Sequence, residues 1–172
     1  MLFRSDGATV TPEQLKQASD SIQPLVDGGL RFTGNEYLQD FASKKTWAAM
    51  TWSGDLASSG AADDVWVAPT EGSMIWTDNM VIPKGAANKY TAELMMNFVY
   101  QPKIAAQIAN YVYYVSPVKG AAEELAKLDA EAAKNPLLFP PDDVVAKQKN
   151  FQFLSDELES SMNDLYSDLS GT

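Results

Sequence analysis

Apolar residues recur at helical spacing in the first part of the chain, within the stretch TVTPEQLKQASDSIQPLV. Thr11 precedes the pattern as an N-cap, Pro12 occupies the first helical position, and Gln14 completes a capping box. The spacing predicts a helix that ends at the DGG of residues 27–29. The predicted buried stripe of this helix is formed by Leu15, Ala18, Ile22 and Leu25.

Later segments carry the same helical pattern or a run of strong helix formers. Pro102 opens one of these helices, and Ser155 is the predicted N-cap of the last. The predicted helices span residues 35–45, 89–100, 102–112, 120–133 and 155–171. Their predicted buried positions include Ala92, Met95, Met96 and Val99 in one helix and Leu158, Met162, Leu165 and Leu169 in another.

Apolar runs between the helices predict strands, because they are short, rich in aromatic or β-branched residues, and bounded by Gly or Pro. These runs span residues 30–33, 46–52, 64–69 and 74–83. Continuous apolar strands between helices are typical of a parallel sheet that is covered on both faces. The pattern therefore predicts an α/β fold, with proline-containing loops at residues 113–120 and 135–143.

The composition is that of a folded domain with a marked acidic balance. The 172 residues include 13 Lys and Arg against 23 Asp and Glu, which gives a formal net charge of −10. Such a charge argues against nucleic acid as a partner, since phosphate binding needs a cationic surface. It is compatible with attraction of a small cation, although acidic surfaces more often serve only solubility.

The sequence contains no cysteine and no histidine. Thiol catalysis, disulfides, Cys/His zinc sites and histidine general bases are therefore excluded. No apolar run approaches the roughly 20 residues of a membrane span. The first ten residues, MLFRSDGATV, lack the apolar core of a signal peptide and do not look like the natural start of a domain.

Asp78 stands in the middle of the predicted strand 74–83. Residues two apart on a strand point the same way, so Trp76, Asp78 and Met80 would share one face. A carboxylate beside a large aromatic side chain is costly to bury without a positive partner. That partner is either a lysine or arginine of the protein or a cation bound from solution.

Aromatic residues near Asp78 favour a bound cation. Trp52 ends the predicted strand 46–52, and ligands of α/β proteins bind at strand ends. Aromatic faces attract ammonium groups by about 0.5–2 kcal/mol each, and a carboxylate at about 4 Å adds on the order of 4 kcal/mol before desolvation. Trp52, Trp76 and Asp78 thus predict a box for an organic cation. In the simpler interpretation, the Trp and Tyr side chains only fill the core.

Hydrolytic chemistry is an alternative that the residues leave open. Asp55 and Asp78 would be the carboxylate pair of a glycoside hydrolase if they lay at catalytic distance. Asp55 is otherwise the N-cap of a helix, and Asp78 is otherwise one half of an ion pair. Glu71 is a further acidic candidate.

Four stretches resemble the periplasmic spermidine/putrescine-binding proteins, the solute-binding components of bacterial polyamine ABC transporters. They are MTWSGD, WVAPTEGSMIWTDNMVIPKGA, MNFVYQPKIAAQIANYVYYVSP and NFQFL. The most specific parts are the Trp-x-Asp before MVIPKGA and the helix pair that ends at a tyrosine before SP. The resemblance runs from about Thr11 to the end of the chain.

This resemblance implies a fold, a cellular location and an incomplete chain. The fold is a type II periplasmic-binding-protein clamshell of the α/β class, of which this chain would be a C-terminal fragment. Residues 1–77 would belong to the second lobe, 78–120 would return to the first lobe, and 121–172 would form a helical segment that docks on the second. The missing first half would hold the signal peptide of a periplasmic protein. An apolar surface is expected where first-lobe elements meet the missing sheet.

The resemblance also implies roles for particular residues. Asp78 would pair with an amine of the ligand, while Trp76 and Trp52 would stack along its methylene chain. Tyr114 would contact the ligand through its ring or hydroxyl, and Gln152 would hydrogen-bond an amine. A further polar contact would come from the region of Thr33 to Asn35, with Thr33 as the named candidate.

A protein of this kind makes and breaks no bond, so no enzyme activity, cofactor or metal is expected. Its partners would be a polyamine and the permease subunits of the transporter, with only peripheral contact at the membrane and a monomeric state. Another small cation is the nearest alternative ligand. Tyr113 and Tyr114 also resemble the adjacent tyrosines of iron-binding members of the wider superfamily, which would make ferric ion the ligand.

Overall fold

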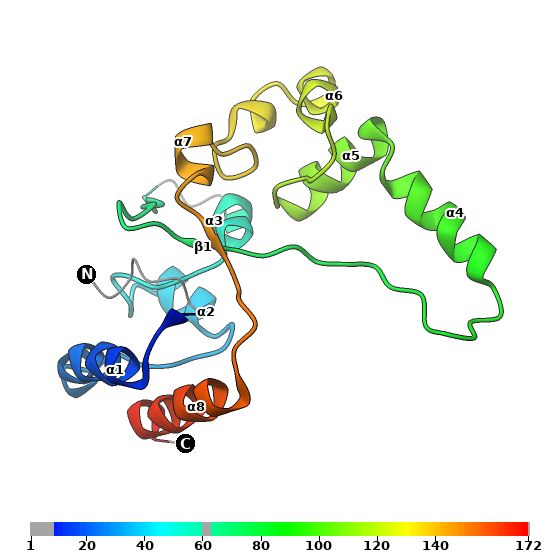
Figure 1. Cartoon of the computed structure of the whole chain (residues 1–172). Helices are drawn as coiled ribbons and strands as arrows, with labels where there is room; N and C mark the ends of the chain where they lie inside the picture. Colours follow the sequence, from blue (N-terminus) through cyan, green and yellow to red (C-terminus); the bar gives the residue numbers. More distant parts are fainter. Residues whose placement is uncertain (1–8, 60–62, 172) are drawn as a thin grey trace. The chain divides into compact units, whose positions relative to one another are not determined.

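The computed structural model describes residues 9–59 and 63–171. The opening residues of the predicted segment 1–77 therefore lie outside the described part of the chain. Two short strands and a series of helices make up the described elements (Figure 1). The strands are β1 (Met74–Ile75) and β2 (Lys149–Asn150). The helices are α1 (Pro12–Asp27), α2 (Tyr37–Ala42), α3 (Ser53–Ser59), α4 (Lys89–Val99), α5 (Pro102–Val112), α6 (Ala121–Leu128), the 3-10 helix η3 (Ala132–Lys134), α7 (Asp142–Val145) and α8 (Asp156–Ser170).

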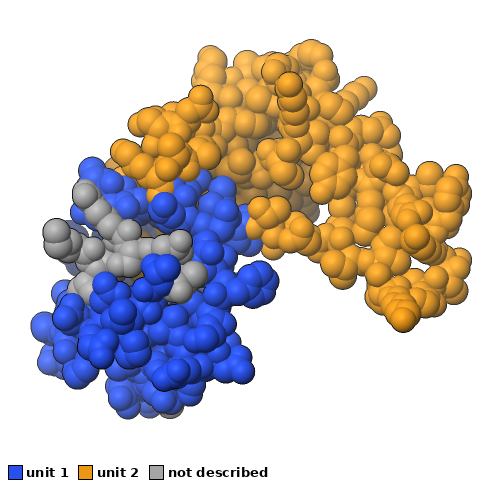
Figure 2. Space-filling model, in the orientation of Figure 1, with its two compact units in different colours: residues 1–48, 69–76, 148–172 blue, residues 49–68, 77–147 orange. Residues whose placement is uncertain are grey.

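The chain divides into two compact units, which Figure 2 shows in different colours. Unit 1 comprises residues 1–48, 69–76 and 148–172, and unit 2 comprises residues 49–68 and 77–147. Each unit is therefore assembled from segments that are distant in the sequence. Unit 1 holds both described strands together with α1, α2 and α8, while unit 2 holds the other helices.

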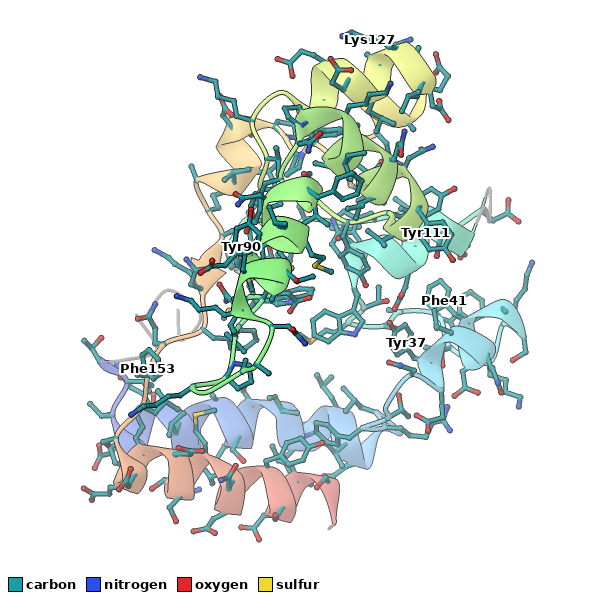
Figure 3. All side chains as sticks on the ribbon, turned by 90° about the vertical axis from the view of Figure 1, so that its right-hand side faces the viewer. Tyr37, Phe41, Tyr90, Tyr111, Lys127 and Phe153 are labelled. Atoms are coloured by element: carbon teal, nitrogen blue, oxygen red, sulfur yellow. The ribbon has the colours of Figure 1, made fainter. Side chains whose placement is uncertain are left out.

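Helices α1 and α8 lie side by side in unit 1 (Figures 1 and 3). The predicted capping box of α1 is confirmed, since Thr11 Oγ1 accepts from the amide of Gln14 at 3.3 Å and the Gln14 side chain accepts from the amide of Thr11 at 2.9 Å. Ser155 caps α8 as predicted, by accepting from the amide of Leu158 at 3.3 Å. Leu158 is buried, whereas Leu25 of the predicted stripe is 56% exposed.

The sheet of unit 1 is much smaller than predicted. β1 and β2 pair in parallel, with Met74 opposite Lys149 and Ile75 opposite Asn150. Of the predicted strand 74–83, only Met74–Ile75 forms a ladder, and the strands predicted at 30–33, 46–52 and 64–69 are wrong for the described chain. The apolar runs are present, but a strand also needs a neighbouring backbone, which among the described residues is found only between β1 and β2.

The core of unit 2 forms where α5 and α6 pack together with η3 and residues 135–139. Ala106, Leu125 and Leu138 are completely buried there. Alanine side chains bring the two helices close, because a small residue lets helix backbones approach. Gly120 adopts a φ of 88° at the N-cap of α6, and only glycine takes up this left-handed conformation without strain.

Much apolar surface of unit 2 is exposed. Tyr90 of α4 and Tyr111 of α5, both labelled in Figure 3, are 73% and 86% exposed. Met95, predicted to be buried on α4, is 57% exposed, because within unit 2 α4 packs chiefly against α5. None of the described helices has the length and apolar character that crossing a membrane requires.

Candidate functional site

The ring of Tyr114 packs on the backbone of Gly54 in the first turn of α3. A β-carbon built at residue 54 would lie 2.4 Å from Cε2 of the tyrosine ring. Trp52 stands directly before this helix, and its carbonyl accepts from the amide of Asp55 at 3.2 Å. The structure thus brings Tyr114 to the start of α3, two residues along the chain from Trp52. Tyr114 is half-buried and Trp52 is 45% exposed.

Tyr113, the preceding residue, reverses the chain after α5. It adopts a φ of 59° in the left-handed region, and its amide donates to the carbonyl of Ala109 at 2.9 Å. Its side chain packs against the core of unit 2. The two adjacent tyrosine rings therefore have different packing partners, with Tyr113 on the core and Tyr114 on Gly54.

Asp78 lies in an irregular segment, residues 76–88, and not in a strand. Its carboxylate is exposed and has neither an ion pair nor a hydrogen bond with any described residue. Next to it, the side-chain amide of Asn79 donates to the carbonyl of Thr77 at 2.9 Å. Among the described residues, no lysine or arginine therefore forms an ion pair with Asp78.

Trp76 and Gln152 follow the two paired strands of unit 1. Trp76 comes directly after β1, and Gln152 comes two residues after the end of β2. Because the strands are parallel, both residues leave the sheet at its carboxyl end, where α/β proteins bind ligands. Trp76 is 38% exposed. Gln152 is exposed, and its side-chain amide donates to the carbonyl of Asn150 at 3.2 Å.

Thr33 is an exposed residue of unit 1 in the connection between α1 and α2. The preceding residue, Phe32, anchors this connection, because its ring meets that of Tyr166 of α8 edge-on with centroids 5.2 Å apart. Arg31 also forms an ion pair with Asp40.

The candidate residues are thus divided between the units. Unit 1 holds Thr33, Trp76 and Gln152, and unit 2 holds Trp52, Asp78 and Tyr114.

Two hollows of unit 2 contain none of the candidate residues. One, of about 480 Å³, is lined by Leu56, Ala57, Asp64, Trp66, Ala68, Asn135, Pro136, Leu137, Pro141 and Val144. The other, of about 460 Å³, is lined by Met80, Val81, Asn88, Thr91, Ala92, Met95 and Met96. Both are chiefly apolar.

Across the described residues, no cluster of three or more Asp and Glu side chains is placed to hold a metal ion.

The sequence resembles several curated proteins along most of its length. It is 29% identical over 154 residues to the putrescine-binding periplasmic protein PotF of Escherichia coli (strain K12), and 28% identical over 154 residues to the spermidine/putrescine-binding periplasmic protein of the same organism. It is 30% identical over 166 residues to the putrescine-binding periplasmic protein SpuD of Pseudomonas aeruginosa (strain UCBPP-PA14). These matches cover 85%, 87% and 90% of this chain.

The chain spans less than half the length of these relatives, since the matches cover 41%, 42% and 43% of them. A family model adds an independent comparison. The model described as bacterial extracellular solute-binding protein matches residues 1–140, which is most of the chain. Membership of this family implies a periplasmic-binding-protein fold, of which the two units present a helix-rich part. The chain belongs to the family of bacterial extracellular solute-binding proteins.

Proposed function

We propose that this chain is part of a solute-binding protein that captures polyamines such as putrescine and spermidine. The proposal rests on family membership and on the relatives, which are named for binding putrescine or spermidine. A further relative from Pseudomonas aeruginosa is named as a putrescine/cadaverine-binding protein. All of these ligands are flexible chains of methylenes with ammonium groups, so a matching site needs anionic and aromatic side chains.

The observation that carries the proposal is that Asp78 is exposed and unpaired among the described residues. Its carboxylate is exposed and has no cationic partner among the described residues, so it is available to an ammonium group from solution. A charge-assisted hydrogen bond of this kind contributes about 1.5–3 kcal/mol. The net charge of −10 adds a long-range attraction for cations that weakens with salt.

The other candidates would recognise the remaining parts of the ligand. Trp52 and Trp76 would lie along the methylene chain, and both retain exposed ring surface for this purpose. Tyr114, whose ring packs on Gly54, would contact the ligand through its ring face or its hydroxyl. Gln152 and Thr33 are exposed polar residues that would accept hydrogen bonds from amines.

In the proposed mechanism, the protein binds its ligand and makes or breaks no covalent bond. The complete protein would be a type II clamshell, of which this chain supplies a C-terminal part. In this assignment residues 1–77 are part of the second lobe, residues 78–120 return to the first, and residues 121–172 form a helical segment that docks on the second. Lobe closure would enclose the polyamine, and the closed protein would deliver it to the permease subunits of an ABC transporter. The protein would act as a monomer in the periplasm and form or break no bond.

Calorimetric titration tests the proposed ligand. The 172-residue chain is joined to the remaining portion of the PotF relative, so that a complete-length protein is present, and is titrated with putrescine and spermidine. We expect saturable binding of at least one diamine or triamine. The control ligand is 1,4-butanediol, which has the length of putrescine but no charge and should give no binding.

The same protein separates the alternatives. Saturable binding of ferric ion without amine binding would replace the proposed ligand by iron, and turnover of a glycoside would replace binding by hydrolysis. If neither amine binds, polyamine capture is rejected. If amines bind equally well after Asp78→Asn, polyamine capture stands but the role given to Asp78 is wrong.

A further inference from the structure

Helix α3 places a residue without a side chain directly under the ring of Tyr114. Gly54 is buried in the first turn of this helix, and its backbone is the surface on which the ring packs. The three atoms nearest to a β-carbon built at residue 54 all belong to the tyrosine ring and lie within 2.7 Å of it, so only glycine permits this packing. Because Trp52 lies two residues earlier, Gly54 sets how closely the ring of Tyr114 approaches a second candidate ligand contact.

The backbone of Tyr113 directs the following side chain toward α3. Its φ of 59° lies in the left-handed region, which a residue with a bulky side chain rarely adopts. Such a conformation persists only where the surrounding structure fixes it, and it occurs preferentially at active sites and ligand sites. Here it is fixed by the hydrogen bond from the Tyr113 amide to the carbonyl of Ala109, a buried residue of α5.

Both sides of the contact between Tyr114 and Gly54 are anchored to one core. Ala57 of α3 and the ring of Tyr113 both pack against the buried cluster of unit 2. Ala57 lies about one helical turn after Gly54, and Tyr113 directly precedes Tyr114. The ring of Tyr114 can therefore shift relative to α3 only if one of these anchors moves. A side chain held in this way is preorganised, which favours binding because little conformational freedom is lost when the ligand arrives.

The chain that follows Tyr114 is held as well. The hydroxyl of Ser116 accepts from the amide of Val118 at 3.3 Å, and the carbonyl of Val118 accepts from the amide of Ala121 at 3.1 Å. Ala121 is buried at the start of α6. Tyr114 thus lies between two segments whose backbones are fixed by hydrogen bonds.

We propose that Gly54 and Tyr113 are positioning residues for amine recognition. Together they would hold the ring of Tyr114 beside Trp52 in the orientation that contacts the polyamine, while neither of them contacts the ligand. The role given to these two residues rests on the proposed function, because it concerns the affinity for amine. A purely structural role would change stability and leave the affinity of the folded protein unaltered.

A double-mutant cycle at residues 54 and 114 tests this role. Putrescine is titrated by calorimetry into the protein in which this chain is joined to the remaining portion of PotF. We expect Gly54→Ala to weaken binding about tenfold, the effect of losing one well-placed contact. In a Tyr114→Ala background, the same change should alter binding by less than about twofold, because no ring is left to displace. A loss of stability alone would act equally in both backgrounds.

Gly28→Ala is the matched control for adding a methyl group. Residue 28 lies in unit 1, and its φ of −81° is one that alanine also adopts. The nearest atoms to a β-carbon there are backbone oxygens at 3.2 and 3.4 Å and belong to no aromatic ring. This variant should bind putrescine as the unmodified protein does. Thermal unfolding of every variant establishes that it is folded at the temperature of the titration.

Two substitutions at residue 113 test the backbone conformation without changing residue 54. Tyr113→Asn and Tyr113→Val both remove the ring that packs on the core, but asparagine tolerates the left-handed region and β-branched valine does not. We expect Tyr113→Val to bind putrescine about fivefold more weakly than Tyr113→Asn, because only valine redirects the chain that carries Tyr114. This pair also provides the test if Gly54→Ala does not fold.

Several outcomes would overturn the positioning role. Unchanged putrescine binding by Gly54→Ala, or an equal loss with and without the ring of Tyr114, would exclude it for Gly54. Equal affinities of the two residue-113 variants would exclude it for Tyr113. These results are distinct from a failure of the proposed function, in which the unmodified joined protein binds no amine and both polyamine capture and the positioning role are rejected.

Discussion

Tyr114 and Gly54 are in direct contact, and the contact tolerates no side chain at residue 54. A β-carbon there would lie 2.4 Å from Cε2, 2.5 Å from Cζ and 2.7 Å from Cδ2 of the tyrosine ring. Real β-carbons do not approach so closely, so either the ring or the first turn of α3 must move if residue 54 changes. The position of Tyr114 near Trp52 therefore depends on a glycine in another segment of unit 2.

We predict that Gly54→Ala displaces the ring of Tyr114 and lowers the free energy of unfolding by about 1–3 kcal/mol, the usual cost of overpacking. Urea denaturation followed by circular dichroism measures the change. Gly34→Ala is the matched control, since its β-carbon meets only the flexible end of the Glu36 side chain, at 3.0 Å. Adding Tyr114→Ala should remove most of the penalty. A penalty that persists in the double variant would show that the ring contact is not its cause.

Asp78→Asn should reduce amine affinity without reducing stability. The carboxylate makes no interaction with the described chain, so its loss costs the fold little, whereas a ligand ammonium would lose about 1.5–3 kcal/mol. Calorimetry of the joined protein measures affinity, and thermal unfolding measures stability. Asp168→Asn is the control for net charge, because Asp168 is likewise an exposed acid without a described partner. Equal affinity losses in both variants would point to long-range charge alone.

Leu125→Ala should be the most destabilising of the predicted substitutions. Leu125 of α6 is completely buried against α5 and residues 135–139. Its truncation leaves a cavity that lowers the free energy of unfolding by about 2–5 kcal/mol. Leu128→Ala on the same helix should cost far less, because that side chain is 53% exposed. Chemical denaturation compares the two. Similar losses would mean that burial does not distinguish these leucines in solution.

Thr11→Ala should weaken the start of α1 by about 1 kcal/mol, because it removes the Oγ1 that accepts from the amide of Gln14. Thr11→Ser keeps the hydroxyl acceptor and should be close to neutral. The difference in unfolding free energy between the two variants measures the contribution of the capping hydroxyl, since only Thr11→Ser retains it. Helix content by circular dichroism provides a second readout, and an unchanged Thr11→Ala variant would exclude a stabilising cap.

The helices of this protein were largely predictable from sequence, because their signals are local. The capping box of α1, Pro102 at the start of α5 and Ser155 at the start of α8 each act within one turn of the chain. Helix α3 was indicated only by the alternative in which Asp55 is an N-cap, and Asp55 instead lies in its first turn, since the glycine and serines of SGDLASS are poor helix formers. Membership of the solute-binding family was likewise indicated by short motifs.

Strand pairing and the surroundings of each candidate residue were decided only by tertiary structure. The apolar run of residues 64–69 has strand composition, but a ladder needs a second backbone, and sequence composition does not state whether one is present. Likewise, the Trp-x-Asp motif indicated Asp78, but only the structure showed its carboxylate exposed and without a cationic partner among the described residues. Local signals fix helices because their hydrogen bonds close within four residues, whereas sheets and sites join residues that are far apart in the chain.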